Sequence, residues 1–121
     1  MPGTATLSGV VLDCPDPTSL ARFYSELSGW AIADRSDATW AQLDTGGRWT
    51  LAFQQAENYR APAWPGQDVP QQFHLDFDVA DLDDGERRVL AMGATKAEHQ
   101  PGTTFRVFLD PAGHPFCLCR D

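Results

Sequence analysis

The sequence nearly repeats itself at an offset of 65 residues, and no other feature limits the possible folds as strongly. Segment 13–16 (DCPD) returns as segment 78–81 (DVAD), and segment 51–54 (LAFQ) aligns with segment 116–119 (FCLC). In each copy, an apolar, strand-like run is followed by an aspartate at a helix-cap position and then by an amphipathic helix that a glycine closes. Such a repeat indicates two copies of one supersecondary unit, so each residue can be compared with its counterpart in the other copy.

The residue patterns predict the same elements in both copies. In the first copy we expect a strand at 9–14, a helix that Asp16 caps and Gly29 ends, and strands at 30–33, 39–43 and 49–54. In the second copy we expect a strand at 73–79, a helix that Asp81 caps and Gly93 ends, and strands at 95–98, 105–109 and 116–119. Each copy therefore reads β-α-β-β-β, and the chain is predicted to have an α+β fold built from two tandem modules.

The 121 residues are predicted to form one domain, 1–121, that holds both modules. Module one spans 7–54, module two spans 73–120, and the linker 55–72 between them contains three prolines. Connections of this length are often functional or disordered. The two aromatic residues of the linker, Tyr59 and Trp64, either cover a pocket or a partner subunit, or belong to a plain surface connection.

The charge of the chain excludes several classes of partner. Seventeen acidic and nine basic residues give a net charge of −8, and the basic residues form no cluster. A phosphate backbone or an anionic membrane surface would be repelled, so we expect neither nucleic acid nor membrane as a partner. The sequence has no apolar run near the roughly 20 residues that span a bilayer, and its first residues do not resemble a signal peptide. Three cysteines are an odd set for a disulfide framework, so we expect reduced thiols and a cytoplasmic protein.

Two motifs of the second module, HLD at 74–76 and DPAGHPFCL at 110–118, complete a pattern that resembles the vicinal oxygen chelate superfamily. Within it the chain is similar to the glyoxalase-like branch, which is related to glyoxalase I, bleomycin-resistance proteins and extradiol dioxygenases. The resemblance covers nearly the whole chain. It implies a curved, eight-stranded mixed sheet that forms a cup, with both helices outside and a small-molecule ligand inside. It also implies a homodimer, because the superfamily often dimerises, but it does not imply one reaction, since this fold hosts many.

Enzymes of this superfamily usually bind one divalent ion through four side chains, two from each module. The corresponding positions here are Gly9, Ala52, His74 and Cys117. Glycine and alanine have no donor atom, whereas a catalytic metal normally needs about three protein ligands. We therefore expect no metal and no other cofactor, and a soft ion on His74, Cys117 and Cys119 is the alternative.

His74 is the main catalytic candidate, because its counterpart in the first module is a glycine. Alternation along its strand places His74, Asp76 and Asp78 on one face, toward the implied cup. A histidine beside a carboxylate is suited to act as a general base, so Asp76 is the second catalytic candidate. A direct His74–Asp76 hydrogen bond is possible but not favoured, since residues i and i+2 of a strand lie roughly 7 Å apart. The alternative is a histidine inherited from a metal-binding ancestor and now only hydrogen-bonded.

Alternation along the other strands gives the ligand-binding candidates. They are Trp40, Gln42, Gln54, Arg106, Phe108 and Cys117. Trp40 and Phe108 are suited to stack on a flat ligand, and Arg106 is suited to pair with a ligand carboxylate or with Asp76. The structural alternatives are an exposed arginine on a strand and a cysteine that serves as a small apolar residue.

These residues support two hypotheses of function. The first is a protein that binds a small, partly aromatic metabolite or drug in a metal-free cup. The second is a metal-independent enzyme of the isomerase or lyase type, with His74 as the proton carrier. A metal-dependent glyoxalase or dioxygenase ranks third, because the set of donor side chains is incomplete.

Overall fold

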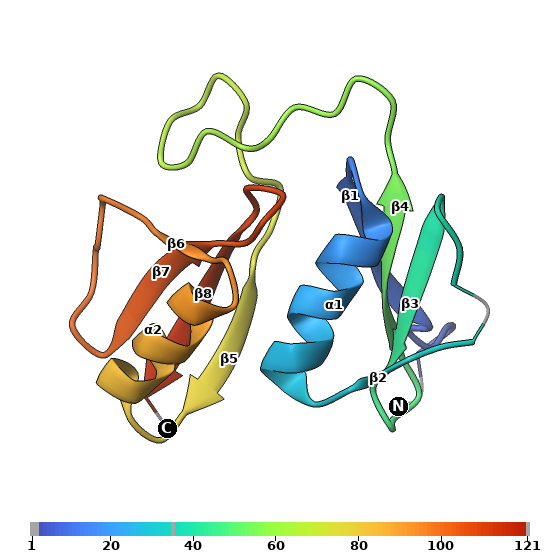
Figure 1. Ribbon diagram of the computed structural model, residues 1–121, viewed down its shortest axis with the longest axis horizontal. Helices are drawn as coiled ribbons and strands as arrows, with labels where there is room; N and C mark the ends of the chain where they lie inside the picture. The colour runs from blue at the N-terminus through green and yellow to red at the C-terminus, as the bar shows by residue number, and fades with distance from the viewer. Residues whose placement is uncertain (1–2, 35, 121) are drawn as a thin grey trace. The chain divides into compact units, whose positions relative to one another are not determined.

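The computed structural model describes residues 3–34 and 36–120, and the chain divides into two compact units, 1–59 and 60–121. The division lies inside the predicted linker, 55–72. Each unit holds one α-helix and one four-stranded mixed sheet. Figure 1 labels these helices and strands. Each unit thus corresponds to one predicted module, and all eight predicted strands and both helices are present.

The first module contains β1 (Gly9–Cys14), α1 (Pro17–Ser28), β2 (Ala31–Ile32), β3 (Trp40–Asp44) and β4 (Thr50–Gln55). The strand order is β1-β4-β3-β2, in which β1 and β4 are parallel and the other pairs are antiparallel. The apolar stripe of α1 packs on one face of this sheet. There Tyr24 stacks on Phe53 of β4, with the ring centroids 5.6 Å apart, so this face is the core of the module.

The second module contains β5 (Leu75–Val79), α2 (Leu82–Ala91), β6 (Thr95–Lys96), β7 (Phe105–Leu109) and β8 (Pro115–Arg120). Its strand order, β5-β8-β7-β6, repeats that of the first module, again with one parallel pair. The helix lies close to the sheet at Gly85, where an added Cβ would meet Leu118 at 3.1 Å and Val79 at 3.3 Å. Phe108 and Phe116 are fully buried on the same face and stack on one another.

The 65-residue offset holds pair by pair in the strand register. Val11 pairs with Ala52 in the first module, and their counterparts Asp76 and Cys117 pair in the second. Likewise, the Gln42–Ala52 pair corresponds to the pair Val107–Cys117. Because the register decides which face of a sheet each side chain occupies, counterparts in the two modules lie on equivalent faces.

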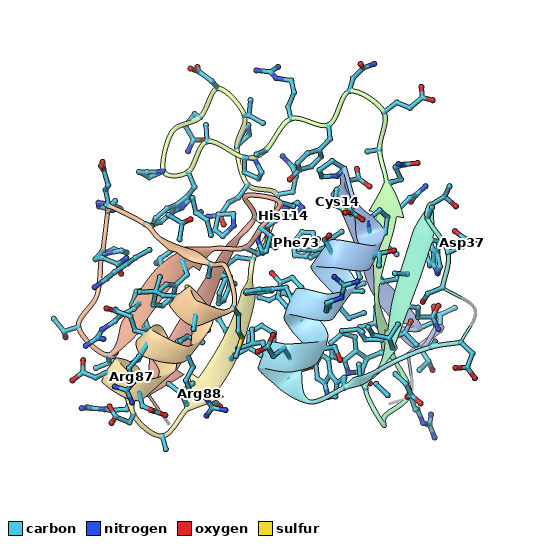
Figure 2. All side chains as sticks on the ribbon, viewed as in Figure 1. Cys14, Asp37, Phe73, Arg87, Arg88 and His114 are labelled. Carbon is cyan, nitrogen blue, oxygen red and sulfur yellow. The ribbon has the colours of Figure 1, made fainter. Side chains whose placement is uncertain are left out.

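Both helices begin at the predicted aspartate caps. The Asp16 side chain accepts hydrogen bonds from the Ser19 amide at 3.3 Å and from the Ser19 hydroxyl at 2.6 Å, and Asp81 accepts from the Asp83 amide at 3.0 Å. Gly29 ends α1 with φ 81°, a left-handed conformation that favours glycine. Arg87 and Arg88 lie on the exposed side of α2 (Figure 2). Within the described residues, neither helix is long and apolar enough to cross a membrane.

The observed strands differ from the predicted ones mainly at the edges of the sheets. The strands β2 and β6 have two residues each instead of the four predicted. Each of them has a sheet neighbour on one side only, so fewer backbone hydrogen bonds extend it. The strand β5 begins at Leu75, two residues later than predicted, so Phe73 and His74 precede it.

Replacing Asp16 by alanine should lower the free energy of unfolding by about 1 kcal/mol, because the Ser19 amide loses its acceptor at the start of α1. Asp16→Asn keeps an acceptor and should retain most of the stability. Urea unfolding followed by circular dichroism measures both changes. An unchanged free energy for Asp16→Ala would show that water satisfies this amide equally well.

Candidate functional site

The second module contains a pocket of about 250 Å³ on the sheet face opposite α2. Its lining residues are Trp64, Gln71, His74, Pro101, Phe105, Val107, Pro115 and Cys117. They come from the linker, from the residue before β5, from the loop before β7, and from β7 and β8. Two aromatic rings and two prolines make the lining predominantly apolar, which is typical of a small-molecule site.

Gln100 fixes the loop that forms one wall of the pocket. Its Nε2 donates hydrogen bonds to the carbonyl oxygens of Ala97 and Val107, both at 2.8 Å. Its Oε1 accepts a hydrogen bond from the Val107 amide at 2.9 Å. The side chain therefore satisfies backbone groups of β7 as a neighbouring strand would. This pairing holds the next residue, Pro101, at the pocket wall.

Phe105 forms a second wall at the start of β7. A Cβ at Gly102 would overlap the Phe105 ring, so only glycine allows the loop to lie this close to the ring. Phe105 packs against a small buried cluster that consists of Ala97, Val107 and Cys117. Trp64 and Cys119 pack against the same cluster. The wall is thus part of the module's packing and not a loose side chain.

Trp64 brings the linker into the pocket. The Ala63 amide donates a hydrogen bond to the Val69 carbonyl at 2.7 Å, which closes a short loop around Trp64. The Trp64 ring contacts the His99 ring, with the centroids 5.5 Å apart. Of the two alternatives for Trp64, the structure supports a residue that lines a pocket. Tyr59 does not line this pocket.

Three polar side chains converge at the pocket edge. His74, Asp76 and Cys117 each offer one potential ligand atom, and these atoms lie within 4.8 Å of one another. His74 Nε2 lies 3.2 Å from Asp76 Oδ1, which is within hydrogen-bond distance. A direct contact between these side chains, which strand spacing makes possible but does not favour, is therefore present. The reason is that His74 precedes β5, so the regular spacing of a strand does not hold it away from Asp76.

The Cys117 thiol is protonated at neutral pH. Burial, the charge of Asp76 and a hydrogen bond with Asp76 together raise the pKa of Cys117 to about 12. The pKa of Cys119 is also raised, by burial and by the charges of Asp76 and Asp78. Because the thiolate is the nucleophile and the metal ligand, Cys117 has little of either character near pH 7.

The ligand-binding candidates of the first module lie on their own sheet, on the face opposite α1. Trp40 pairs with Gln54 across β3 and β4, and Gln42 pairs with Ala52. The Trp40 Nε1 donates a hydrogen bond to Gln42 Oε1 at 3.4 Å. The lining residues of the second-module pocket do not include these side chains. A ligand contact for Trp40, Gln42 and Gln54 stays a prediction.

The prediction that Arg106 and Phe108 face the cup is wrong, because both lie on the helix-covered face of their sheet. Arg106 donates hydrogen bonds to Asp83 Oδ1 at 2.8 Å and to Glu86 Oε1 at 3.2 Å, both on α2. The hydrogen bond with Asp83 is the main reason why the pKa of Arg106 is raised. Phe108 is fully buried against Phe116. Alternation defines two sets of residues but does not tell which set meets the helix.

The repeat itself holds the signal that identifies the pocket face of β7. The counterparts of Trp40 and Gln42 at the 65-residue offset are Phe105 and Val107, and these two residues line the pocket. Gln71, which also lines the pocket, was not among the predicted site residues either, for a different reason. It belongs to the linker, which has no counterpart in the repeat, and no local pattern marks it.

A family model for the glyoxalase-like domain matches residues 9–119, from the first residue of β1 to within β8. This chain belongs to the glyoxalase-like domain family. The match includes both modules. It confirms the family that the sequence motifs predicted and is consistent with the vicinal oxygen chelate superfamily.

Several solved structures share the fold of this chain. A glyoxalase/bleomycin resistance protein/dioxygenase family enzyme from Burkholderia phytofirmans is 22% identical, with a TM-score of 0.72 over 96% of this chain and 98% of that one. A fosfomycin resistance protein from Mesorhizobium loti is 16% identical, with a TM-score of 0.68 over 98% and 93%. A lactoylglutathione lyase from Agrobacterium tumefaciens is 17% identical, with a TM-score of 0.64 over 99% and 96%. These similarities confirm the predicted fold class. No curated protein matches the sequence significantly.

The residues of this glyoxalase-like domain do not fit the four-ligand metal site that the superfamily implies. Gly9 and Ala52 provide no donor atom. A Cβ at Gly9 would lie 2.9 Å from the Thr50 hydroxyl oxygen and 3.1 Å from the Thr50 carbonyl oxygen, so a larger side chain would displace Thr50. The donors that remain, His74 and Cys117, both interact with Asp76. Asp76 completes a group of three donors, but it lies at none of the four implied positions, so the residues present do not reproduce the implied site.

Cys117 should make stability depend on pH above about pH 9. Because the pKa of the thiol is about 12 in the folded protein and 9.0 in an unperturbed cysteine, the folded state holds this proton more tightly. The resulting stabilisation is complete below pH 9 and is lost as the pH rises toward 12. Cys117→Ala removes the titrating group. The free energy of unfolding of the wild type should therefore fall relative to this variant from about pH 9 upward, by at most ~1.4 kcal/mol per pH unit.

Urea unfolding of both proteins at several pH values between about pH 8 and about pH 11 measures this difference. Cys119 is present in both proteins, so its own titration cancels. A difference that stays constant with pH would contradict the raised pKa of Cys117.

Proposed function

We propose that this glyoxalase-like domain binds a small, partly aromatic metabolite or drug in the pocket of the second module, without a bound metal. The observation that carries the proposal is the pocket of about 250 Å³, with its predominantly apolar lining and His74 at its edge. Ligand pockets usually measure about 300–1,000 Å³ and combine apolar walls with a few polar groups. The volume of about 250 Å³ lies just below this range, so the pocket suits a small ligand.

Two aromatic side chains support a ligand with a flat apolar part. Trp64 and Phe105 both line the pocket and pack against the same buried cluster. Aromatic rings bury a large area and prefer offset or edge-to-face contacts with other rings, which stabilise a pair by about 0.5–1.5 kcal/mol beyond the burial itself. Both rings are held in place, one by the loop at 63–69 and the other by the close approach of Gly102. A preformed aromatic wall lowers the entropic cost of binding.

The names of similar structures support a small-molecule protein without selecting one reaction. One is named a fosfomycin resistance protein and another a lactoylglutathione lyase. The fold thus serves both resistance and catalysis, and the function has to be argued from the site. In this chain the site has an aromatic wall and an incomplete set of metal donors, which favours binding without a metal.

Addition of nickel, zinc or iron(II) should leave the melting temperature of the purified protein essentially unchanged, because the positions of Gly9 and Ala52 supply no ligand atoms. Thermal unfolding with and without each ion measures this, since an ion bound to the folded state stabilises it by mass action. Elemental analysis of the protein as purified gives an independent readout. A stoichiometric ion, or a large rise in melting temperature that His74→Ala abolishes, would contradict the metal-free proposal.

A thermal-shift screen with small planar aromatic compounds should yield ligands that raise the melting temperature in a concentration-dependent way. Trp64→Ala should lower the binding affinity of these ligands by about tenfold or more, which corresponds to about 1.4 kcal/mol of binding free energy. Trp40→Ala is the matched control, because Trp40 is also half-buried but lies on the first-module sheet. If only Trp40→Ala weakened binding, the site would lie in the first module and the proposal would be overturned.

A metal-independent enzyme is the second candidate, and the His74–Asp76 contact at 3.2 Å favours it. With Nε2–H donating to the carboxylate, Nδ1 carries the lone pair that accepts a proton, and Asp76 stabilises the resulting imidazolium. Such a base would exchange an acidic C–H proton of a bound ligand with solvent. Nuclear magnetic resonance of each screened ligand in D₂O should then show deuterium uptake with the wild type and none with His74→Gln. Ligands that bind without any uptake would assign the protein to binding alone.

A further inference from the structure

We infer that the pocket of the second module selects ligands that are neutral or cationic and that offer a hydrogen-bond donor, and that it rejects anions. This inference rests on the proposed function and adds the chemical class of the ligand. It follows from Gln71, from the His74–Asp76 pair and from the distribution of charge around the pocket.

Gln71 is the first element of this selection. It lines the pocket, and its Oε1 is buried and has no hydrogen-bond partner among residues 3–34 and 36–120. A buried acceptor without a partner destabilises a protein by about 1–3 kcal/mol. A ligand that donates a hydrogen bond to this oxygen would remove that cost, whereas a ligand without a donor would leave it in place. Gln71 therefore favours donors over other ligands of the same shape.

His74 is the second element. Its Nε2 lies 3.2 Å from Asp76 Oδ1, and because a carboxylate only accepts hydrogen bonds, a proton on Nε2 would suit this contact. The other ring nitrogen, Nδ1, is then an acceptor in the neutral imidazole. Gln71 and His74 thus each supply an acceptor, and a hydrogen-bond donor on the ligand complements either of them.

The charges near the pocket give the selection against anions. Asp76 lies at the pocket edge within hydrogen-bond distance of His74, and Asp78 follows on the same face of β5. Among the described lining residues there is no lysine or arginine. The nearest arginine along the strands, Arg106, points to the other face and is held there by Asp83 and Glu86. An anionic ligand would therefore meet carboxylates without a compensating cation.

Three probes that share a naphthalene ring separate these effects. 2-Naphthol is neutral and offers an O–H donor, 2-methoxynaphthalene has the same ring without the donor, and 2-naphthoate is an anion. Isothermal titration calorimetry at neutral pH should show that 2-naphthol binds at least about tenfold more tightly than either of the other probes, as expected for one buried hydrogen bond. Gln71→Met should abolish the preference for 2-naphthol over 2-methoxynaphthalene, while leaving 2-methoxynaphthalene binding unchanged. Gln72→Met, at the exposed neighbouring position, is the matched control and should retain the preference.

The outcomes distinguish this inference from the proposed function. Equal binding of 2-naphthol and 2-methoxynaphthalene to the wild type, or stronger binding of 2-naphthoate, would overturn the inferred ligand class while the pocket stands as a binding site. A preference for 2-naphthol that Gln71→Met leaves intact would overturn the role of Gln71. If no probe binds, and no compound of the aromatic screen binds in a manner sensitive to Trp64→Ala, the proposed function fails and the inference fails with it. The wild-type comparison needs no variant, so it decides the ligand class even if Gln71→Met does not fold.

Discussion

The burial of one face of each sheet under its helix is the constraint on which the rest of the structure depends. In the second module, Phe108, Phe116 and Leu118 are buried on the α2 side. Because side chains alternate along a strand, the residues between them must face the other way, which places Phe105, Val107 and Cys117 at the pocket. A shift of one residue in the register would exchange the two sets and replace the pocket wall with Arg106 and Phe108. The core of the module and the lining of its pocket are therefore fixed by the same packing.

The two modules keep the same register but differ in the side chains that it presents. Cap residues and core positions recur in both copies, since each module needs a capped helix and a buried face. At the equivalent pocket positions, the second module has His74, Asp76 and Cys117 where the first has Gly9, Val11 and Ala52. Residues shared by both copies thus explain the fold, and the residues unique to one copy explain why the chemistry of this chain concentrates in the second module.

Most of the fold could be predicted from the sequence, because local signals and the repeat agree. Asp16, Asp81 and Gly29 mark the helix ends through short-range hydrogen bonds and backbone conformation, and such effects act within a few residues. The candidate site was harder to predict from the sequence than the fold. The face of Arg106 depends on contacts with α2, 20 and 23 residues away, although the offset from Trp40 and Gln42 points to Phe105 and Val107 instead. The positions of Gln71 and Trp64 depend on how the linker closes on itself, which no periodic pattern encodes.

The two donors at the implied metal positions, His74 and Cys117, are best understood together with Asp76. In a metal site, an ion would balance the charge of its ligands and hold them in place. Here the Asp76 carboxylate interacts with both His74 and Cys117, the two donor side chains at the implied metal positions. In the proposed metal-free pocket, the Asp76 carboxylate leaves the cluster with a negative charge. Its polarity toward a ligand is therefore the reverse of that in a metal enzyme, in which the ion attracts electron-rich oxygen atoms. In the proposed function, His74 beside the Asp76 carboxylate and the unpartnered Gln71 oxygen would attract hydrogen-bond donors, and this reversal would separate the pocket from the metal-dependent reactions of the same fold.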